Sequence, residues 1–206
     1  GYLRQSEGSA PGLQFLEYQT FLASMALVLL ADDAYAFMIA WESMALSSFF
    51  LVTSDHRNPE IRRAGYLYLL IAHIGAIGIL LCFGVLQSGS NPAAGSVADY
   101  TFAHMRATPH DAFWASAAKA GILPLHIWLP EAHPAAPSPV SAMMSGVMLK
   151  TALYGVLRVC FDLLHLSPML WWWGVALLAL GLASALFGAI FSAVQSDMKR
   201  LLAYSS

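Results

Sequence analysis

The chain has 206 residues, of which 58% are hydrophobic and only 11% are charged. Because an ordinary soluble domain carries about 25% charged residues, this composition excludes a typical soluble fold and indicates a membrane protein. The 10 basic and 12 acidic side chains nearly balance and form no polybasic patch, which argues against nucleic acid as a partner.

Apolar runs of about 20 residues, the length that crosses a bilayer as a helix, occur at six places. They predict membrane helices at residues 13–31, 34–53, 64–86, 112–129, 140–160 and 170–194, and the start of a seventh helix at residue 198. The connections are short except for residues 87–111, whose composition predicts an exposed loop with room for a short surface helix. We expect an all-α, polytopic transmembrane bundle that forms a single transmembrane domain over residues 1–206.

The fourth run carries Lys119 within apolar sequence and Pro124 five residues later. A lysine at bilayer depth costs about 2.5–3.5 kcal/mol on insertion scales, so it normally faces protein or water and marks an ion path. Pro124 has no N–H to donate to the carbonyl of Ala120, so we expect the helix to break near Pro124. Transporters commonly build ion sites from a charge beside a broken helix.

Three more ionisable residues fall near mid-membrane, namely Glu42, His73 and Lys150. Lys150 lies far from both ends of its predicted helix, so its ammonium group cannot easily reach either membrane surface. A buried lysine paired with a carboxylate can load and release a proton, which an arginine cannot do. The alternatives are a structural role for Glu42, a hydrogen-bonded core position for His73 and a snorkelling side chain for Lys119.

Motifs for metal, nucleotide or nucleophilic chemistry do not stand out in the sequence. His126 and His133 are separated by two prolines and do not have a helical ligand spacing. Cys82 and Cys160 lie in apolar runs, which predicts buried thiols and not a disulfide or a metal pair. We therefore expect no catalytic residue, metal or cofactor in this chain, and any redox chemistry must reside in other chains.

The basic residues predict an orientation in the membrane. One side carries Arg4, Arg57, Arg62, Arg63, Lys199 and Arg200, whereas the other carries Arg106 and Arg158. The positive-inside rule makes the first side cytoplasmic. The acidic Asp32–Asp33 turn and the tryptophans at 171–173 are then external. In the sixth run, small residues four apart, such as Ser184, Gly188 and Ser192, predict close helix packing and no specific function.

Several motifs make the sequence recognisable. KAGILPLHIWLPEAH at 119–133, LKTALYG at 149–155 and DMKRLLAYSS at 197–206 closely resemble the antiporter-like, proton-translocating membrane subunits of the respiratory complex I family. The forms PEAHPAAPS at 130–138 and MSGVM at 144–148 are most similar to the branch found in membrane-bound hydrogenases, which contains the large antiporter-like subunit of hydrogenase-4 and formate hydrogenlyase.

The resemblance implies roles for single residues. Glu42 matches the family's membrane glutamate, Lys119 the lysine of the first broken helix, and Lys150 the bridging basic residue of the next helix. In the family these residues form one half-channel, and a second, inverted repeat of five helices supplies the other. We expect this chain to be a fragment that covers the first repeat and the start of the second.

The implied function is that of a membrane subunit in a redox-driven proton pump of the NADH:quinone oxidoreductase or membrane-bound hydrogenase type. Iron–sulfur clusters, flavin or a nickel–iron centre are expected only in the partner subunits, both membrane and peripheral. The expected location is the bacterial cytoplasmic membrane. Two alternatives stay open, namely a subunit of a multisubunit sodium/proton antiporter and a structural membrane subunit without transport.

Overall fold

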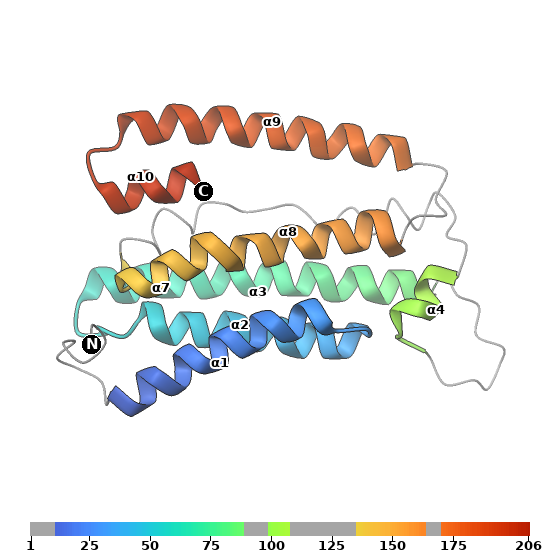
Figure 1. The fold of residues 1–206 in the computed structure, drawn as a ribbon, viewed down its shortest axis with the longest axis horizontal. Helices are drawn as coiled ribbons and strands as arrows, with labels where there is room; N and C mark the ends of the chain where they lie inside the picture. The colour runs from blue at the N-terminus through green and yellow to red at the C-terminus, as the bar shows by residue number, and fades with distance from the viewer. Residues whose placement is uncertain (1–10, 89–98, 108–134, 164–169) are drawn as a thin grey trace.

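The structure is a computed structural model that describes residues 11–88, 99–107, 135–163 and 170–206, and these residues are almost entirely helical (Figure 1). The helices are α1 (Pro11–Leu30), α2 (Ala34–Val52), α3 (Pro59–Ser88), α4 (Phe102–Ala107), α9 (Leu170–Val194) and α10 (Met198–Ser205). A further rod, residues 138–163, runs through α7 (Ser138–Met143), η2 (Met144–Met148), α8 (Leu149–Leu157) and η3 (Arg158–Leu163). Within these ranges, β pairing is limited to an isolated bridge between Asp33 and Thr101.

Five of the described helices are long and apolar enough to cross a membrane. They are Gly12–Leu30, Ala34–Val52, Pro59–Gln87, Ser138–Leu163 and Gly174–Val194. The predicted all-α polytopic bundle is therefore confirmed, and α10 confirms the helix expected at residue 198. The helix predicted at 112–129 lies outside the described residues, as does its break at Pro124.

Helix α3 begins earlier than the sequence predicted, at Pro59 instead of residue 64. The reason is local, because the Asn58 side chain accepts a hydrogen bond from the N–H of Glu60 (2.9 Å) and proline suits a first helical turn. The Arg62 side chain also donates to the carbonyl of His56 at 3.0 Å. The first turns of α3 are thus polar and lie beyond the apolar run from which the prediction was made.

Helices α1, α2, α3 and the 138–163 rod lie side by side, with α2 packed against both α1 and α3 (Figure 1). Two apolar clusters fill the bundle. The first contains Val28, Phe37, Phe83, Phe102 and Leu163, and the second contains Phe21, Met44, Leu51, Tyr68 and Met144. Cys82 and Cys160 are both buried free thiols in the first cluster, as the sequence predicted.

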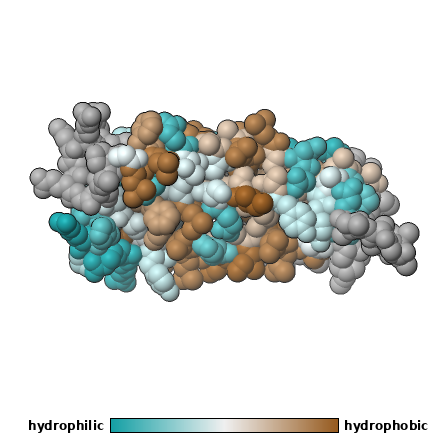
Figure 2. All heavy atoms as spheres, turned by 90° about the horizontal axis from the view of Figure 1, so that it is seen from below, coloured by the Kyte–Doolittle hydropathy of each residue, from teal (hydrophilic) through white to brown (hydrophobic). Residues whose placement is uncertain are grey.

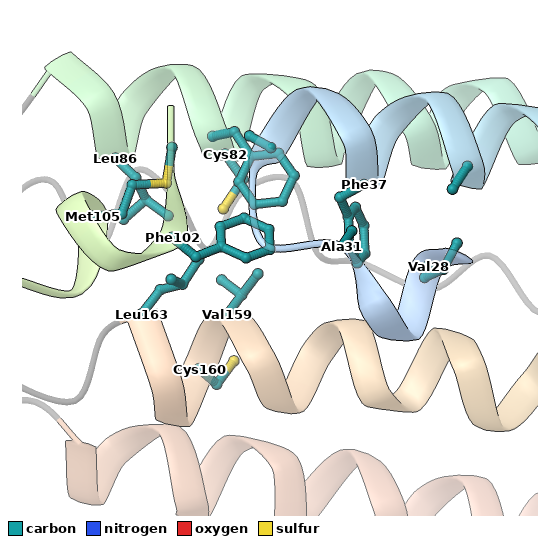
Figure 3. Packing of buried hydrophobic residues seen from close by; sticks show 13 residues of the cluster. Val28, Ala31, Phe37, Cys82, Leu86, Phe102, Met105, Val159, Cys160 and Leu163 are labelled. Carbon is teal, nitrogen blue, oxygen red and sulfur yellow. The ribbon is translucent and has the colours of Figure 1, made fainter. Parts of the chain in front are cut away.

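Residues 99–107 of the segment predicted as an exposed loop with room for a short surface helix contain the helix α4, which is partly buried. Helix α4 buries Phe102 and Met105 completely between α3 and the end of the 138–163 rod (Figure 3). Backbone bonds of 3.0 Å from Ala34 N to Tyr100 O and from Phe102 N to Asp32 O hold this segment against the α1–α2 turn. The short helix was allowed for, but the burial of Phe102 and Met105 was not, because a six-residue helix is too short to show an amphipathic period.

Helix α9 lies along the outer side of the described bundle, and α10 folds back beside it (Figure 1). None of the membrane-spanning part of α9, Gly174–Val194, is buried against the other described residues. Trp171 and Trp172 at its start are exposed. The face of the molecule in Figure 2 has polar side chains gathered toward both ends and apolar side chains over much of the middle, as expected for a chain that crosses a bilayer.

Candidate functional site

Glu42 and His73 face each other across α2 and α3. The Nε2 atom of His73 lies 3.8 Å from Oε2 of Glu42, and the two side chains are 47% and 32% exposed respectively. The Nδ1 atom of His73 lies 2.9 Å from the carbonyl oxygen of Leu69, one turn earlier in α3. The structure therefore brings together two of the four ionisable residues that the sequence placed near mid-membrane.

Lys150 lies in α8, directly after the π-helical segment η2. It is exposed, and among the described residues no ion pair joins it to a carboxylate. Its neighbour Thr151 is buried, and the Thr151 hydroxyl donates to the carbonyl of Val147 at 3.1 Å. The described part of the structure thus leaves Lys150 separate from the Glu42–His73 pair.

The π-helical segments η2 and η3 on either side of α8 were not predicted from the sequence. A π-helix accommodates an extra residue in its turn, which rotates all the side chains that follow it, and such segments occur often at functional sites. Gly146 within η2 is the one residue in the sequence that could have indicated an irregular helix there, since glycine weakens an α-helix. The rotation after η2 therefore sets the face on which Lys150 lies.

Lys119 and Pro124 lie outside the described residues, as do His126 and His133. The roles of Lys119 and Pro124 in an ion path stay predictions. Among the residues that are described, no group of three or more His, Cys, Asp or Glu side chains could hold a metal ion.

The sequence did not predict an ionic cluster at one end of the bundle, where Arg106 and Arg158 indicated only the topology. Arg106 of α4 donates to both carboxylate oxygens of Asp162, at 2.7 and 2.9 Å. Arg158 lies 3.2 Å from Asp32 and 3.6 Å from Asp162. The hydrogen bond to Asp162 raises the pKa of Arg106, which therefore stays charged. The cluster joins the α1–α2 turn, α4 and η3 by charge.

Two further contacts hold Arg158 in this cluster. Its guanidinium carbon lies 4.8 Å from the centre of the Phe102 ring, and it donates to the hydroxyl of Tyr154. The Tyr154 hydroxyl in turn donates to the carbonyl of Leu29 at 3.1 Å. The spacing of four residues between Arg158 and Asp162 was the only signal in the sequence that could have indicated this cluster.

Comparison with known proteins decides the family. Residues 31–206 match the family described as NADH:quinone oxidoreductase/Mrp antiporter, TM. The chain belongs to this family. It is an antiporter-like, multi-pass integral membrane protein, as the motifs at 119–133, 149–155 and 197–206 indicated.

Relatives of this antiporter-like chain come from two kinds of complex. The whole chain is 40% identical to hydrogenase-4 component B of Escherichia coli (strain K12), of which it covers 31%. It is 29% identical, over 95% of its length, to NADH-quinone oxidoreductase subunit M of Pseudomonas aeruginosa, of which it covers 41%. The chain thus spans less than half the length of these curated relatives.

The fold of the antiporter-like chain also occurs in a solved structure. A chain in the membrane-bound sulfane sulfur reductase, an archaeal respiratory membrane complex, superposes with a TM-score of 0.81. The match covers 98% of this chain and 43% of the other, at 18% sequence identity. At that identity the comparison establishes the shared fold alone.

The geometry of the Glu42–His73 pair suits proton transfer in this antiporter-like chain. A separation of 3.8 Å exceeds an ordinary hydrogen bond, so a small movement or one bridging water joins the two groups. Carboxylate and imidazole are both acid–base side chains, which makes the pair a candidate for proton transfer.

Proposed function

We propose that this chain is a membrane subunit of a redox-driven proton pump and that Glu42, His73, Lys119 and Lys150 form its proton path. The observation that carries the proposal is the meeting of Glu42 and His73 across two membrane-spanning helices. Ionisable side chains within membrane helices are expensive to insert and usually serve a pathway. Relatives named as subunits of a hydrogenase and of an NADH-quinone oxidoreductase support the coupling to a redox reaction.

In the proposed mechanism, Glu42 and Lys119 form a switchable ion pair. While they are paired, each stabilises the charge of the other and Lys119 keeps its proton. When a conformational change separates them, the low-polarity surroundings favour neutral lysine, and the proton passes to Lys150 directly or through water. His73 serves Glu42 as the neighbouring proton acceptor.

The energies involved are of compatible size. Moving one charge across the membrane costs about 2.3 kcal/mol per 100 mV. A hundredfold change in the proton affinity of a lysine corresponds to about 2.7 kcal/mol. A change in proton affinity of this size when one ion pair separates is therefore large enough to move one proton against a membrane potential of about 100 mV.

Electron transfer belongs, in this proposal, to partner subunits that hold the iron–sulfur clusters, flavin or nickel–iron centre. Other membrane subunits and the peripheral arm of the complex are the proposed partners, and the bacterial cytoplasmic membrane is the proposed location. The chain itself supplies the membrane half of the coupling.

The test uses the full-length subunit in its assembled complex. Glu42→Gln and His73→Gln keep the size and polarity of the side chains but remove or weaken their acid–base function. We expect both variants to lower the number of protons moved per electron while the complex still assembles. Tyr66→Phe, an exposed change on the same helix as His73, is the control. Normal pumping by Glu42→Gln would contradict the proposal and favour a structural role for this carboxylate.

A second candidate function is sodium/proton exchange, because the matched family includes the Mrp antiporters. The two functions differ in what drives proton movement. Proton flux that requires an electron donor supports the redox pump, whereas flux driven by a sodium gradient alone supports the antiporter. Neighbouring genes separate them as well, since hydrogenase or NADH-dehydrogenase chains accompany the first and a run of small antiporter subunits the second.

A further inference from the structure

A buried pair of hydroxyl groups lies between α2, α3 and the 138–163 rod. The hydroxyl of Tyr68 in α3 is 2.5 Å from that of Ser48 in α2, and either oxygen can be the donor. Tyr68 is 1% exposed and Ser48 is 0% exposed. The Tyr68 hydroxyl is also 3.9 Å from the sulfur of Met148, the last residue of η2. Three elements thus meet at one hydroxyl pair.

This pair lies on the same helix interface as Glu42 and His73. Helices α2 and α3 run in opposite directions, so Ser48 and Tyr68 form the next polar contact along the interface after Glu42 and His73. Six residues of α2 and five of α3 separate the two contacts, which is about 7–9 Å at the rise of an α-helix.

The pair also lies on the side of Glu42 that leads to the basic end of the bundle. From Ser48, α2 continues to Thr53 and then to the turn that carries Arg57 and Arg62 (Figure 1). This end is the cytoplasmic one in the predicted topology. A proton that enters from it toward Glu42 along the α2–α3 interface therefore passes Ser48 and Tyr68.

The hydrogen bonds of the pair allow two arrangements. In one, Tyr68 donates to Ser48, and Ser48 donates to the carbonyl of Ala45 at 2.9 Å. In the other, Ser48 donates to Tyr68, and Tyr68 donates to the sulfur of Met148. Each hydroxyl keeps an acceptor in both arrangements, so the direction of the chain can reverse without leaving a buried donor unpaired.

We propose that Tyr68 and Ser48 form a reversible proton relay between the basic end of the bundle and the Glu42–His73 pair; this rests on the proposed function. Ser48 receives a proton from water on the basic side and passes its own proton to Tyr68. Tyr68 gives its own proton to water on the side of Glu42. Both hydroxyls then rotate back, so that one proton has moved and each side chain is unchanged.

The relay is tested in the full-length subunit within its assembled complex. Tyr68→Phe and Ser48→Ala each remove one hydroxyl and add no volume. We expect each variant to slow proton translocation on the order of tenfold or more. We also expect the translocation rate of each variant to fall more steeply than that of the unaltered protein when the pH is raised on the side that carries Arg57 and Arg62, because proton uptake becomes limiting. A residue with only a packing role would not change this pH profile.

Two matched controls come from the same structure. Tyr66→Phe removes a hydroxyl from a tyrosine that is 68% exposed on α3. Ser24→Ala removes the hydroxyl of a buried serine that donates to Phe21 O of its own helix at 2.8 Å. Both controls should translocate protons normally.

The outcomes separate the relay from the proposed function. If Tyr68→Phe and Ser48→Ala pump normally while Glu42→Gln does not, the relay is wrong and the proposed function stands. If Glu42→Gln also pumps normally, the proposed function itself fails. If both hydroxyl variants fail to assemble while Ser24→Ala assembles, the pair holds the helices together, and the relay is overturned in favour of a packing role.

Discussion

The proton on neutral His73 has a defined position. Its Nδ1 atom faces the carbonyl oxygen of Leu69, which only accepts hydrogen bonds, so Nδ1 carries the proton. Nε2 is then the nitrogen without a hydrogen in the neutral ring, and it is the atom that faces Glu42. The backbone of α3 therefore directs the acid–base atom of His73 toward its partner.

Lys119 offers the sharpest test of the switch at the scale of one residue. Arginine keeps the positive charge but cannot release a proton at physiological pH, whereas alanine removes the charge. If Lys119 transfers protons, Lys119→Arg and Lys119→Ala both stop pumping through this subunit in the full-length assembled complex. Proton-to-electron ratios in reconstituted vesicles measure this. Normal pumping by Lys119→Arg would make Lys119 a structural counter-charge to Glu42.

At the scale of elements, α9 and α10 form a tight hairpin. The stacked rings of Phe191 and Tyr204 lie 5.6 Å apart, and a Cβ atom placed on Gly188 would lie 2.7 Å from the carbonyl oxygen of Tyr204. The Lys199 ammonium group also donates to the carbonyl of Ala136 at 3.0 Å, which ties the start of α10 to the start of the 138–163 rod. The hairpin is therefore held by a close backbone approach as well as by side chains.

Gly188→Ala tests that approach. The new methyl group meets a backbone atom that cannot rotate away, so we expect a destabilisation of about 1–3 kcal/mol. Gly181→Ala is the matched control, because a Cβ atom there meets nothing within 4 Å. Thermal unfolding of the purified full-length protein in detergent compares the two. Equal melting temperatures for the two variants would show that α10 does not pack this closely on α9.

At the scale of the whole molecule, charge separates along the bundle. The turn between α2 and α3 and the start of α10 lie at one end, whereas the α1–α2 turn, α4 and η3 lie at the other (Figure 1). Arg57, Arg62 and Lys199 belong to the first end, and the ionic cluster of Arg106, Arg158, Asp32 and Asp162 belongs to the second. In that cluster, acidic partners neutralise the arginines.

This separation predicts the orientation in the membrane. We expect Asn58 to be cytoplasmic and Ala103 to be external, because Arg57, Arg62 and Arg63 cluster around Asn58 in the sequence. Both positions are exposed, so single cysteines introduced there can react with an impermeant thiol reagent in intact cells. The native cysteines, Cys82 and Cys160, are buried and should stay unlabelled. If the reagent labels Asn58→Cys but not Ala103→Cys from outside, the orientation is the opposite of the predicted one.

The sequence by itself determined the membrane class, the approximate positions of the five described membrane helices and the family. An apolar run of sufficient length forms a membrane helix wherever it packs, because backbone hydrogen bonds must be made inside the segment. The family motifs are also local, since each occupies consecutive residues. Glu42, His73 and Lys150 could therefore be selected as candidates, because a charge within an apolar run is visible without a fold.

Only the tertiary structure decided which of these residues meet. Glu42 faces His73, and Ser48 faces Tyr68, because packing sets the rotation and register of α2 against α3. The burial of Phe102 and the ionic cluster join residues of α4 and η3 that lie 56 or more positions apart. Hydropathy along the chain contains no information on how each helix turns about its axis. That rotation follows from side-chain packing between helices, which exists only once the bundle has formed.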